Sequence, residues 1–264
     1  MPAPVNLAQA IAVDGWFGRL GRCLWAPRCL VCGEPARSRL DLCPACEAGL
    51  PWMPPACLSC AMPLPQPAPG ANAAAAGAPG PPRPSRVHQP RLCSACQHDP
   101  PPLSEVHAAF LYGFPLDRLL PRLKFHRDLA AGRLLAHAMA ACFAGLARPD
   151  VLVPVPLHRA RMRQRGYNQA LELAHPLGRT LELPVHTGLL LRIRNTSAQS
   201  RLDADARVGN LRDAFVVAGR GAPPPHVVLV DDVMTTGATL HAAADALFDA
   251  GVDRVDAWIC ARAP

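Results

Sequence analysis

The segment from His226 to Leu240, HVVLVDDVMTTGATL, brings two carboxylates next to a run of small and hydroxyl-bearing residues. Four branched apolar residues, Val227 to Val230, predict a buried parallel strand. The strand leads directly into Asp231 and Asp232, at its carboxyl end. The residues that follow predict a tight loop before an apolar-periodic helix: Thr235, Thr236, Gly237, Ala238 and Thr239.

A strand, a tight loop and a helix in this order are typical of an anion site in an α/β protein. Backbone N–H groups and the positive end of the helix point at the anion, and hydroxyl groups add hydrogen bonds. The two carboxylates would repel a phosphate, so we expect them to accept hydrogen bonds from sugar hydroxyls or to hold a metal ion. A ribose phosphate meets both requirements, because its phosphate suits the loop and its hydroxyls suit the carboxylates. The alternative is a strand-turn-helix in which the acidic pair caps the helix and the threonines form a turn.

From Val227 to Thr239 the sequence resembles, without a gap, the signature of the type I phosphoribosyltransferases, which bind phosphoribosyl pyrophosphate (PRPP). The resemblance implies Mg²⁺ and PRPP as ligands. It implies that Asp231 and Asp232 hold the ribose hydroxyls and that Thr235 to Thr239 surround the 5′-phosphate.

A second candidate anion site follows the apolar run Val151 to Val155. Four arginines cluster there in the stretch PLHRARMRQRGYNQA: Arg159, Arg161, Arg163 and Arg165. Ligands of open α/β sheets bind at the carboxyl ends of the strands, so this loop would face the same crevice and receive pyrophosphate. Their alternate spacing lets two of the four point inward, and we single out Arg163 and Arg165 as catalytic candidates beside Asp231 and Asp232. The alternative is a solvated basic turn.

Eight of the eleven cysteines form four CxxC pairs: Cys29 and Cys32, Cys43 and Cys46, Cys57 and Cys60, and Cys93 and Cys96. Two thiolates separated by two residues reach one ion, and two such knuckles complete a tetrahedral Cys₄ zinc site. The pattern therefore predicts two structural Zn²⁺ ions. A redox role is the weaker alternative, because redox CxxC motifs stand alone beside a βαβ unit.

The pairing of the four knuckles stays open at the level of sequence. We favour sequential pairing, which gives a double zinc ribbon, but nested and interleaved arrangements fit the same spacing. His88 and His98 lie nearby and are expected not to ligate, since eight thiolates fill two sites. Cys142 and Cys260 fall in apolar patterns and are expected in the core, while Cys23 has no predicted role.

The stretch VPVPLHRARMRQRGYNQA narrows the resemblance to the ComF group of phosphoribosyltransferase-like proteins, which also carry cysteine knuckles ahead of the transferase domain. A further stretch, Arg192 to Phe215, matches the same group through Gln199, Ser200, Arg207, Asn210 and Phe215. The resemblance covers roughly Cys29 to Cys260. It implies a type I phosphoribosyltransferase fold and a mobile flap from Arg192 to Asn210.

Alternating patterns support an α/β class with a mostly parallel sheet flanked by helices. Strands are predicted at His107–Tyr112, Val151–Val155, Val185–Ile193, Ala214–Val217, Val227–Val230 and Arg254–Ala261, and helices at Leu116–Lys124, Leu129–Leu146, Ala170–Leu181 and Thr239–Ala250. We expect an amphipathic segment at 1–28, a double zinc ribbon at 29–100 with a disordered Pro/Ala/Gly-rich insert at 61–92, and a phosphoribosyltransferase domain at 105–264.

Composition sets the broad class. With 50% apolar and 18% charged residues, a packed core is expected. The net charge of +7 supports a polyanion partner only weakly, because Lys124 is the only lysine and the abundance of Arg, Ala, Pro and Gly suggests nucleotide bias. The sequence shows no membrane span and no signal peptide, so we expect a cytoplasmic protein with reduced cysteines.

Three functions fit these features. The first is an enzyme that transfers phosphoribosyl from PRPP to an unknown nitrogen acceptor and releases pyrophosphate. The second is a PRPP sensor without turnover. The third is a cytosolic competence factor for DNA uptake that binds single-stranded DNA through zinc ribbons and basic loops. The low aromatic content of 5% argues against this third function, because bases stack on aromatic side chains. The intact PRPP motif favours the first function, the transfer of phosphoribosyl.

Overall fold

The computed structural model describes residues 28–36, 40–65, 91–194, 213–219 and 221–263. The chain divides into two compact units, Met1–Glu47 and Ala48–Pro264. The smaller unit contains the first two CxxC pairs, and the larger one contains the other two pairs together with the sheet. The predicted double zinc ribbon at 29–100 is therefore divided between the two units.

In the smaller unit, a tight turn brings the first CxxC pair together. The N–H of Cys29 donates to the carbonyl of Glu34 at 2.7 Å, and the N–H of Gly33 donates back to the carbonyl of Cys29 at 2.9 Å. Gly33 has a φ of +80°, a conformation that L side chains rarely adopt. A short helix, α2 (Pro44–Ala48), carries the last cysteine of the unit, Cys46.

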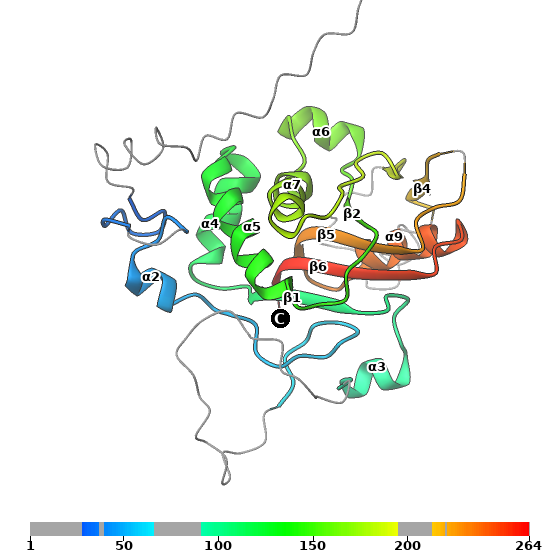
Figure 1. The fold of residues 1–264 in the computed structure, drawn as a ribbon, viewed down its shortest axis with the longest axis horizontal. Coiled ribbons are helices and arrows are strands. Elements are labelled where there is room, and N and C mark those ends of the chain that lie inside the picture. The colour runs from blue at the N-terminus through cyan, green and yellow to red at the C-terminus, as the bar shows by residue number, and fades with distance from the viewer. Residues whose placement is uncertain (1–27, 37–39, 66–90, 195–212, 220, 264) are drawn as a thin grey trace, which may run out of the picture. The chain divides into compact units, whose positions relative to one another are not determined.

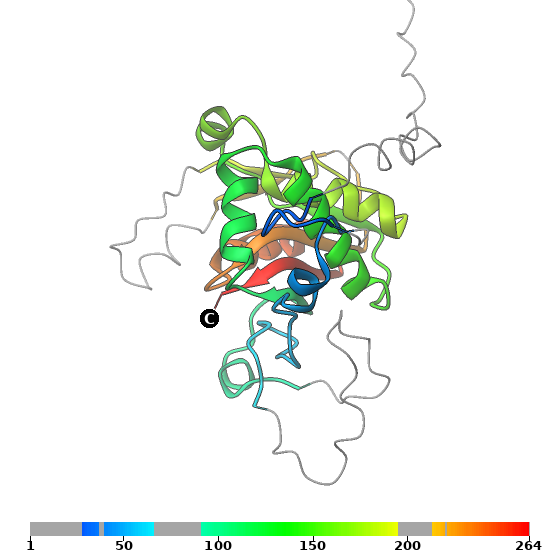
Figure 2. The same ribbon diagram turned by 90° about the vertical axis from the view of Figure 1, so that its left-hand side faces the viewer.

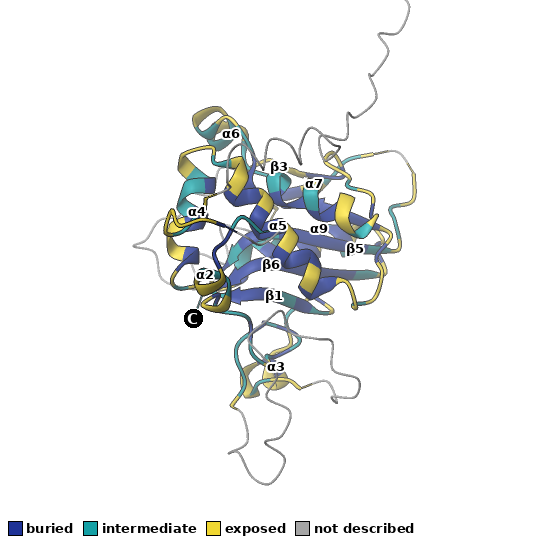
Figure 3. Ribbon diagram, turned by 60° about the vertical axis from the view of Figure 1, so that its left-hand side comes forward, coloured by how far each residue is buried: buried dark blue, intermediate teal, exposed yellow. Residues whose placement is uncertain are grey.

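The larger unit is built on a four-stranded parallel sheet in the order β1-β6-β5-β2. Its strands are β1 (Val106–Leu111), β6 (Arg254–Arg262), β5 (His226–Met234) and β2 (Val151–Pro154). The two central strands are almost entirely buried along their length (Figure 3). Burial on both faces explains their continuous apolar runs, in contrast to the alternation of a half-exposed strand.

Helices cover both faces of this sheet, as Figures 1 and 2 show. One face carries α5 (Leu129–Phe143) and α7 (Gln169–Leu181), with α4 (Leu116–Phe125) packed on α5. The other face carries α9 (Ala238–Asp249) and an antiparallel pair, β3 (Leu190–Arg192) with β4 (Phe215–Val217). Two short helices, α3 (Ser94–His98) and α6 (Arg159–Arg165), lie outside these layers. The predicted α/β class with a mostly parallel, helix-flanked sheet is confirmed.

The prediction of one strand from Val185 to Ile193 is wrong. Val185 makes an isolated parallel bridge to Leu152, whereas β3 begins only at Leu190. A turn separates them, in which the N–H of Gly188 donates to the Nδ1 of His186 at 3.2 Å. The β-branched and aliphatic residues on both sides of the turn gave the appearance of a single strand. Helix α5 also ends at Phe143, three residues before the predicted Leu146.

The predicted insert at 61–92 lies mainly outside the described residues, as do the N-terminal segment up to residue 27, Cys23 and His88. Its described ends take part in the second pair of knuckles. Ala56 bridges Pro63, and the N–H of Leu58 donates to the carbonyl of Arg91 at 3.2 Å.

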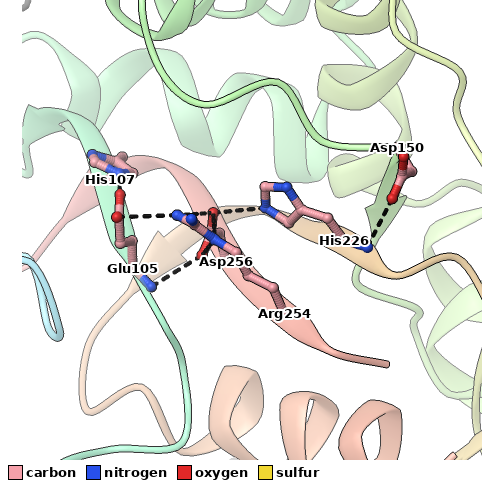
Figure 4. Close-up of polar contacts among 6 residues, drawn as sticks. All are labelled: Glu105, His107, Asp150, His226, Arg254 and Asp256. Carbon is pink, nitrogen blue, oxygen red and sulfur yellow. Dashed lines mark hydrogen bonds and ion pairs between the residues drawn. The ribbon is translucent and has the colours of Figure 1, made fainter. Parts of the chain in front are cut away.

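A polar network holds the amino ends of the central strands together (Figure 4). At its centre Asp256, only 3% exposed, accepts hydrogen bonds from the Nε2 of His226 at 2.8 Å and the Nε of Arg254 at 3.0 Å. Because a buried carboxylate is costly unless it is paired, these partners fix three chain segments at this edge. The remaining contacts are the Glu105 N–H with the Oδ1 of Asp256, Arg254 with Glu105, Glu105 with His107, and the His226 N–H with Asp150. The opposite edge, at the carboxyl ends of the strands, is left for a ligand.

Among the described residues, no helix is long and apolar enough to cross a bilayer. The longest, α5, spans 15 residues, whereas a membrane-spanning helix needs about 20.

Candidate ligand site and cysteine centres

Strand β5 runs through the acidic pair and ends four residues later than predicted, at Met234. The sequence placed Asp231 and Asp232 just beyond the strand, but both pair alongside β6, whose ladder with β5 continues to the match of Met234 with Arg262. On the other side, β2 stops at Pro154, opposite Val230. The carboxylates therefore lie where the sheet narrows, beyond the carboxyl end of β2.

Since neighbouring residues of a strand point to opposite faces, the structure gives the two carboxylates different surroundings. Asp232 is 8% exposed and lies on the side of α4, where its Oδ2 is 3.0 Å from the Nζ of Lys124. Asp231 is half-buried and interacts electrostatically with Arg192 on β3. The sequence treated the two as one pair, whereas Asp232 forms an ion pair with Lys124 and Asp231 interacts electrostatically with both Lys124 and Arg192.

Asp231 has a strongly shifted acidity. Burial raises its pKa to about 7, and the negative charge of Asp232 adds to this rise. The backbone N–H of Asp232, which donates to the Oδ1 of Asp231 at 2.8 Å, acts in the opposite direction, as do Lys124 and Arg192. Carboxylates with raised pKa values that lie at the ligand edge of a sheet are candidates for a functional site.

The loop after β5 consists of Thr235, Thr236 and Gly237, with both threonines exposed. Gly237 has a φ of +81°, and a Cβ there would lie 2.5 Å from the Cε of Met234 and 2.8 Å from the Nε2 of His241. Glycine is favoured at this position, because L side chains rarely adopt this φ and a Cβ would force the side chains of Met234 and His241 to shift. The other two predicted loop residues, Ala238 and Thr239, are instead the first residues of α9. Their place in the first helical turn leaves N–H groups free of intrahelical acceptors, as an anion site requires.

The arginine-rich segment after β2 is helix α6 and not the predicted loop. Arg159 and Arg163 are exposed, while Arg161 and Arg165 are half-buried. The guanidinium of Arg165 lies over the ring of Phe125, 5.4 Å from its centroid. Burial lowers the pKa of Arg192, as does the charge of Arg161, while Asp231 raises it. Arg192 thus interacts electrostatically with both Asp231 and Arg161, whereas Arg165 packs on an aromatic ring.

The RGYNQA motif has a structural explanation. Gly166, with a φ of +79°, ends α6, and Asn168 caps α7 by accepting from the N–H of Ala170 at 3.1 Å. The Nδ2 of Asn168 also donates to the carbonyl of Val155 at 3.0 Å. The hydroxyl of Tyr167 donates to the carbonyl of Leu123. These bonds fix the chain that leaves β2 next to the acidic pair.

Lys124 and Arg192 were not among the residues that the sequence singled out for the site. Lys124 carried one usable signal, because it is the only lysine of the chain. Arg192 carried no signal beyond its place at the start of the predicted flap. The other flap residues, Gln199, Ser200, Arg207 and Asn210, lie outside the described residues.

The eight CxxC cysteines form two clusters with sequential pairing, as favoured from the sequence: Cys29, Cys32, Cys43 and Cys46, and Cys57, Cys60, Cys93 and Cys96. Within each cluster, the sulfur atoms all lie within 4.8 Å of one another. The Sγ atoms of Cys32 and Cys43 are 3.6 Å apart, and those of Cys60 and Cys93 are 3.7 Å apart. A tetrahedral ion with bonds of about 2.3 Å requires sulfur separations of about 3.8 Å.

The crowded thiols influence one another's ionisation. Burial raises the pKa of both Cys46 and Cys96, and the neighbouring sulfurs raise it further. Burial acts in the same direction on Cys29 and Cys57, but hydrogen bonds from backbone N–H groups lower the pKa of Cys29 to about 6 and that of Cys57 to about 7. Four thiolates this close would repel one another, and a bound cation would offset that repulsion. His98 is exposed and lies outside both clusters. Cys142 and Cys260 are buried away from them, as predicted.

Known proteins are similar to most of this chain. The DNA utilization protein YhgH of Salmonella typhimurium is 33% identical over 240 residues, which cover 89% of this chain and 89% of the relative. Competence protein F of Haemophilus influenzae is 34% identical over 179 residues, or 65% of this chain and 78% of the relative. The chain belongs to the ComF family.

Other similarities concern parts of this ComF-family chain. Competence protein ComFC of Bacillus subtilis is 30% identical over 178 residues, or 64% of this chain and 70% of the relative. A family model described as a double zinc ribbon domain matches residues 20–77. A solved structure of hypoxanthine phosphoribosyl transferase from Trypanosoma cruzi covers 48% of this chain and 63% of its own, with 19% identity and a TM-score of 0.31.

The raised pKa of Asp231 predicts a pH-dependent cost in stability. Its ordinary value is 3.8 and its value in the folded protein is about 7. Because the folded state holds the proton more tightly than the unfolded state does, the contribution of Asp231 to the free energy of unfolding is greatest below pH 3.8. It falls as the pH rises to about 7 and is constant above that. We therefore expect Asp231→Asn to gain stability over the unmodified protein across this window.

Urea unfolding without ligand at a series of pH values measures this difference. Asp213→Asn is the control, since the Asp213 side chain is 80% exposed. Parallel stability curves for the unmodified protein and Asp231→Asn would show that the carboxyl titrates normally.

Proposed function

We propose that this ComF-family protein binds PRPP with Mg²⁺ and transfers its phosphoribosyl group to a nitrogen acceptor, with release of pyrophosphate. The observation that carries the proposal is the junction of β5 and α9. There a half-buried carboxylate, two exposed threonines and a glycine with a φ of +81° precede the first turn of a 12-residue helix. The same residues carry the sequence resemblance to the PRPP signature.

In this proposal the loop and the helix bind the 5′-phosphate. Thr235 and Thr239 supply hydroxyls, while Thr236 shapes the loop, since its Oγ1 accepts from the N–H of Ala238 at 3.4 Å. Gly237 and Ala238 let the backbone approach the anion. Helix N-termini and such loops bind phosphate through their N–H groups.

Asp231 and Asp232 have different roles in this proposal. Asp231 would accept hydrogen bonds from the ribose hydroxyls or hold Mg²⁺. Mg²⁺ prefers oxygen ligands such as a carboxylate, and Asp231 lies near the carboxyl ends of the strands, where a ligand is expected. When bound, Mg²⁺ would neutralise charge on the departing pyrophosphate. Asp232, which is buried and paired with Lys124, would position the backbone of Asp231 and balance the charge around it.

Cations on α6 and β3 would receive the pyrophosphate. Arg163 and Arg165 remain candidates from the sequence, Arg192 is favoured by its electrostatic interaction with Asp231, and Arg161 is favoured by its interaction with Arg192. Positively charged donors aimed at a leaving pyrophosphate stabilise the charge that develops there in the transition state.

We predict that two sets of substitutions affect two ligands differently. Arg161→Gln with Arg192→Gln should weaken PRPP about tenfold or more while changing ribose 5-phosphate little, because only PRPP carries pyrophosphate. Thr235→Val with Thr239→Val should weaken both ligands about equally, because both carry the 5′-phosphate. Calorimetry with Mg²⁺ measures both affinities.

Arg159→Gln is the matched control, an exposed arginine on the same helix. Arg163→Gln with Arg165→Gln tests the pair chosen from the sequence. Wild-type protein that binds neither ligand would refute the proposed function. Binding of PRPP without release of pyrophosphate, in the presence of a panel of amines, would identify a sensor and not an enzyme.

We also propose that each cysteine cluster holds one structural Zn²⁺, in a cytoplasmic protein whose thiols stay reduced. Metal analysis of anaerobically prepared protein should give two zinc ions per chain. Cys57→Ala should lose one of them, because three thiolates remain in the second cluster, while the control Cys142→Ala, which lies outside both clusters, should retain two. Retention of both ions in Cys57→Ala would contradict the assignment.

A second candidate function, binding of single-stranded DNA, is favoured by one surface feature. Phe125 is 65% exposed at the end of α4 and carries the guanidinium of Arg165 over its ring. The neighbouring Arg127 lies over Tyr167, 5.7 Å from the ring centroid. Exposed aromatic rings beside arginines are where bases stack in single-strand binding proteins. The names of the relatives, competence and DNA utilization proteins, agree with such a role.

For this candidate, Phe125→Ala should lower the affinity for a single-stranded oligonucleotide about fivefold or more, since each stacked base contributes about 1–3 kcal/mol. Phe114→Ala is the matched control, because Phe114 is 58% exposed at the other end of α4 and also lies beside an arginine, Arg118. A fluorescence titration at several salt concentrations measures the binding. Equal losses in both variants would reject this surface.

A further inference from the structure

Arg262, the last residue of β6, lies between the second cysteine cluster and the loop that follows β5. Its side chain is buried, with 7% of the residue exposed. The Nε donates to the carbonyl of Cys60 at 2.9 Å, and the Nη1 donates to the carbonyl of Met234 at 3.2 Å and to that of Ala263. One guanidinium therefore joins a metal-ligating knuckle to the end of β5.

Met234 connects Arg262 to the loop that begins at Thr235. Its carbonyl also accepts from the N–H of Ala263 at 2.9 Å, so two donors hold the residue directly before Thr235. The residue is 2% exposed, and its side chain packs against Gly237, where a Cβ would lie 2.5 Å from the Cε of Met234. The path from Cys60 through Arg262 and Met234 ends on the glycine that shapes the loop.

The charge of Arg262 adds an electrostatic reason for the link. Within the described part of the chain, the acceptors of its side chain are backbone carbonyls and not carboxylates. A buried guanidinium needs a negative neighbour. A Zn²⁺ ion held by four thiolates carries a net negative charge, and the knuckle of Cys57 and Cys60 brings that charge to Arg262.

The knuckle is also fixed to the sheet on its other side. The N–H of Val106 at the start of β1 donates to the carbonyl of Leu58 at 2.6 Å. Trp52, which precedes the knuckle, stacks on Phe110 with 4.7 Å between ring centroids. When the cluster keeps its metal, the carbonyl of Cys60 is therefore held in one place relative to Arg262.

We infer that Arg262 is a positioning residue that couples metal loading of the second cysteine cluster to the conformation of the Thr235–Gly237 loop. The inference rests on the proposed function only in regarding that loop as the phosphate site. Metal loss releases the carbonyl of Cys60 and removes the negative charge beside Arg262. The end of β5 and the loop then lose a fixed support, and ligand affinity falls with them.

Hydrogen exchange measured by mass spectrometry on the full-length, zinc-loaded protein tests the coupling without any ligand. Removal of zinc by a chelator should speed exchange of the peptide over 235–240 about tenfold. Arg262→Met should show this fast exchange before zinc is removed and little further change after it. Arg179→Met is the control, because Arg179 is an exposed arginine near the end of α7, and it should behave as the unmodified protein. The α5 peptide over 129–143 should stay protected throughout, which separates loop opening from unfolding.

A loop peptide whose exchange does not respond to zinc removal would overturn the inference, as would an Arg262→Met loop that is as protected as that of the unmodified protein. Calorimetry with ribose 5-phosphate then separates this inference from the proposed function. If the coupling holds, zinc removal lowers the affinity in the unmodified protein and in Arg179→Met, whereas Arg262→Met binds weakly with or without zinc. If the unmodified protein binds no ribose 5-phosphate at all, the proposed function fails, and the exchange data alone decide whether Arg262 couples the two elements.

Discussion

The parallel pairing of β5 with β6, which extends from His226 to Met234 and beyond the end of β2, is the constraint on which the other features depend. Because the ladder continues through Asp231 and Asp232, both carboxylates have extended backbone and point to opposite faces of the sheet. The same ladder brings Met234 opposite Arg262 and so fixes where the loop to α9 begins. At the other end, the network around Asp256 aligns β5, β6 and the start of β1.

Division of the acidic pair between two faces determines the electrostatics of the candidate site. Two carboxylates in one low-dielectric crevice would oppose each other's ionisation. Here Asp232 pairs with Lys124 on the side of α4, and Asp231 faces the charge of Arg192 on the side of β3. The pKa of Asp231 is nonetheless raised, chiefly by burial and further by the charge of Asp232. A cation or hydroxyl donor placed next to Asp231 would offset this cost of ionisation.

The two cysteine clusters share a ligand set but differ in their dependence on the rest of the chain. The first belongs to the small unit and is closed by local turns between Cys29 and Cys46. A unit of this size buries little apolar surface, so a metal would supply much of its folding free energy. The second cluster belongs to the larger unit, where β1 and Arg262 bind its knuckle. The first cluster thus has contacts within its own small unit, whereas the second is joined through Arg262 to the carboxyl end of β5.

The sequence alone determined the features that local chemistry specifies. CxxC spacing predicted the two cysteine clusters, apolar runs predicted the parallel strands, and the segment around Asp231 and Asp232 predicted a strand, a tight loop and a helix. Only the tertiary structure decided which face each carboxylate occupies, that the arginine-rich segment is a helix, and that Lys124, Arg192 and Arg262 lie beside the site. These residues come from α4, β3 and β6, and their positions follow from strand order and helix packing. Such contacts between distant segments leave no periodicity or spacing in the sequence from which they could be predicted.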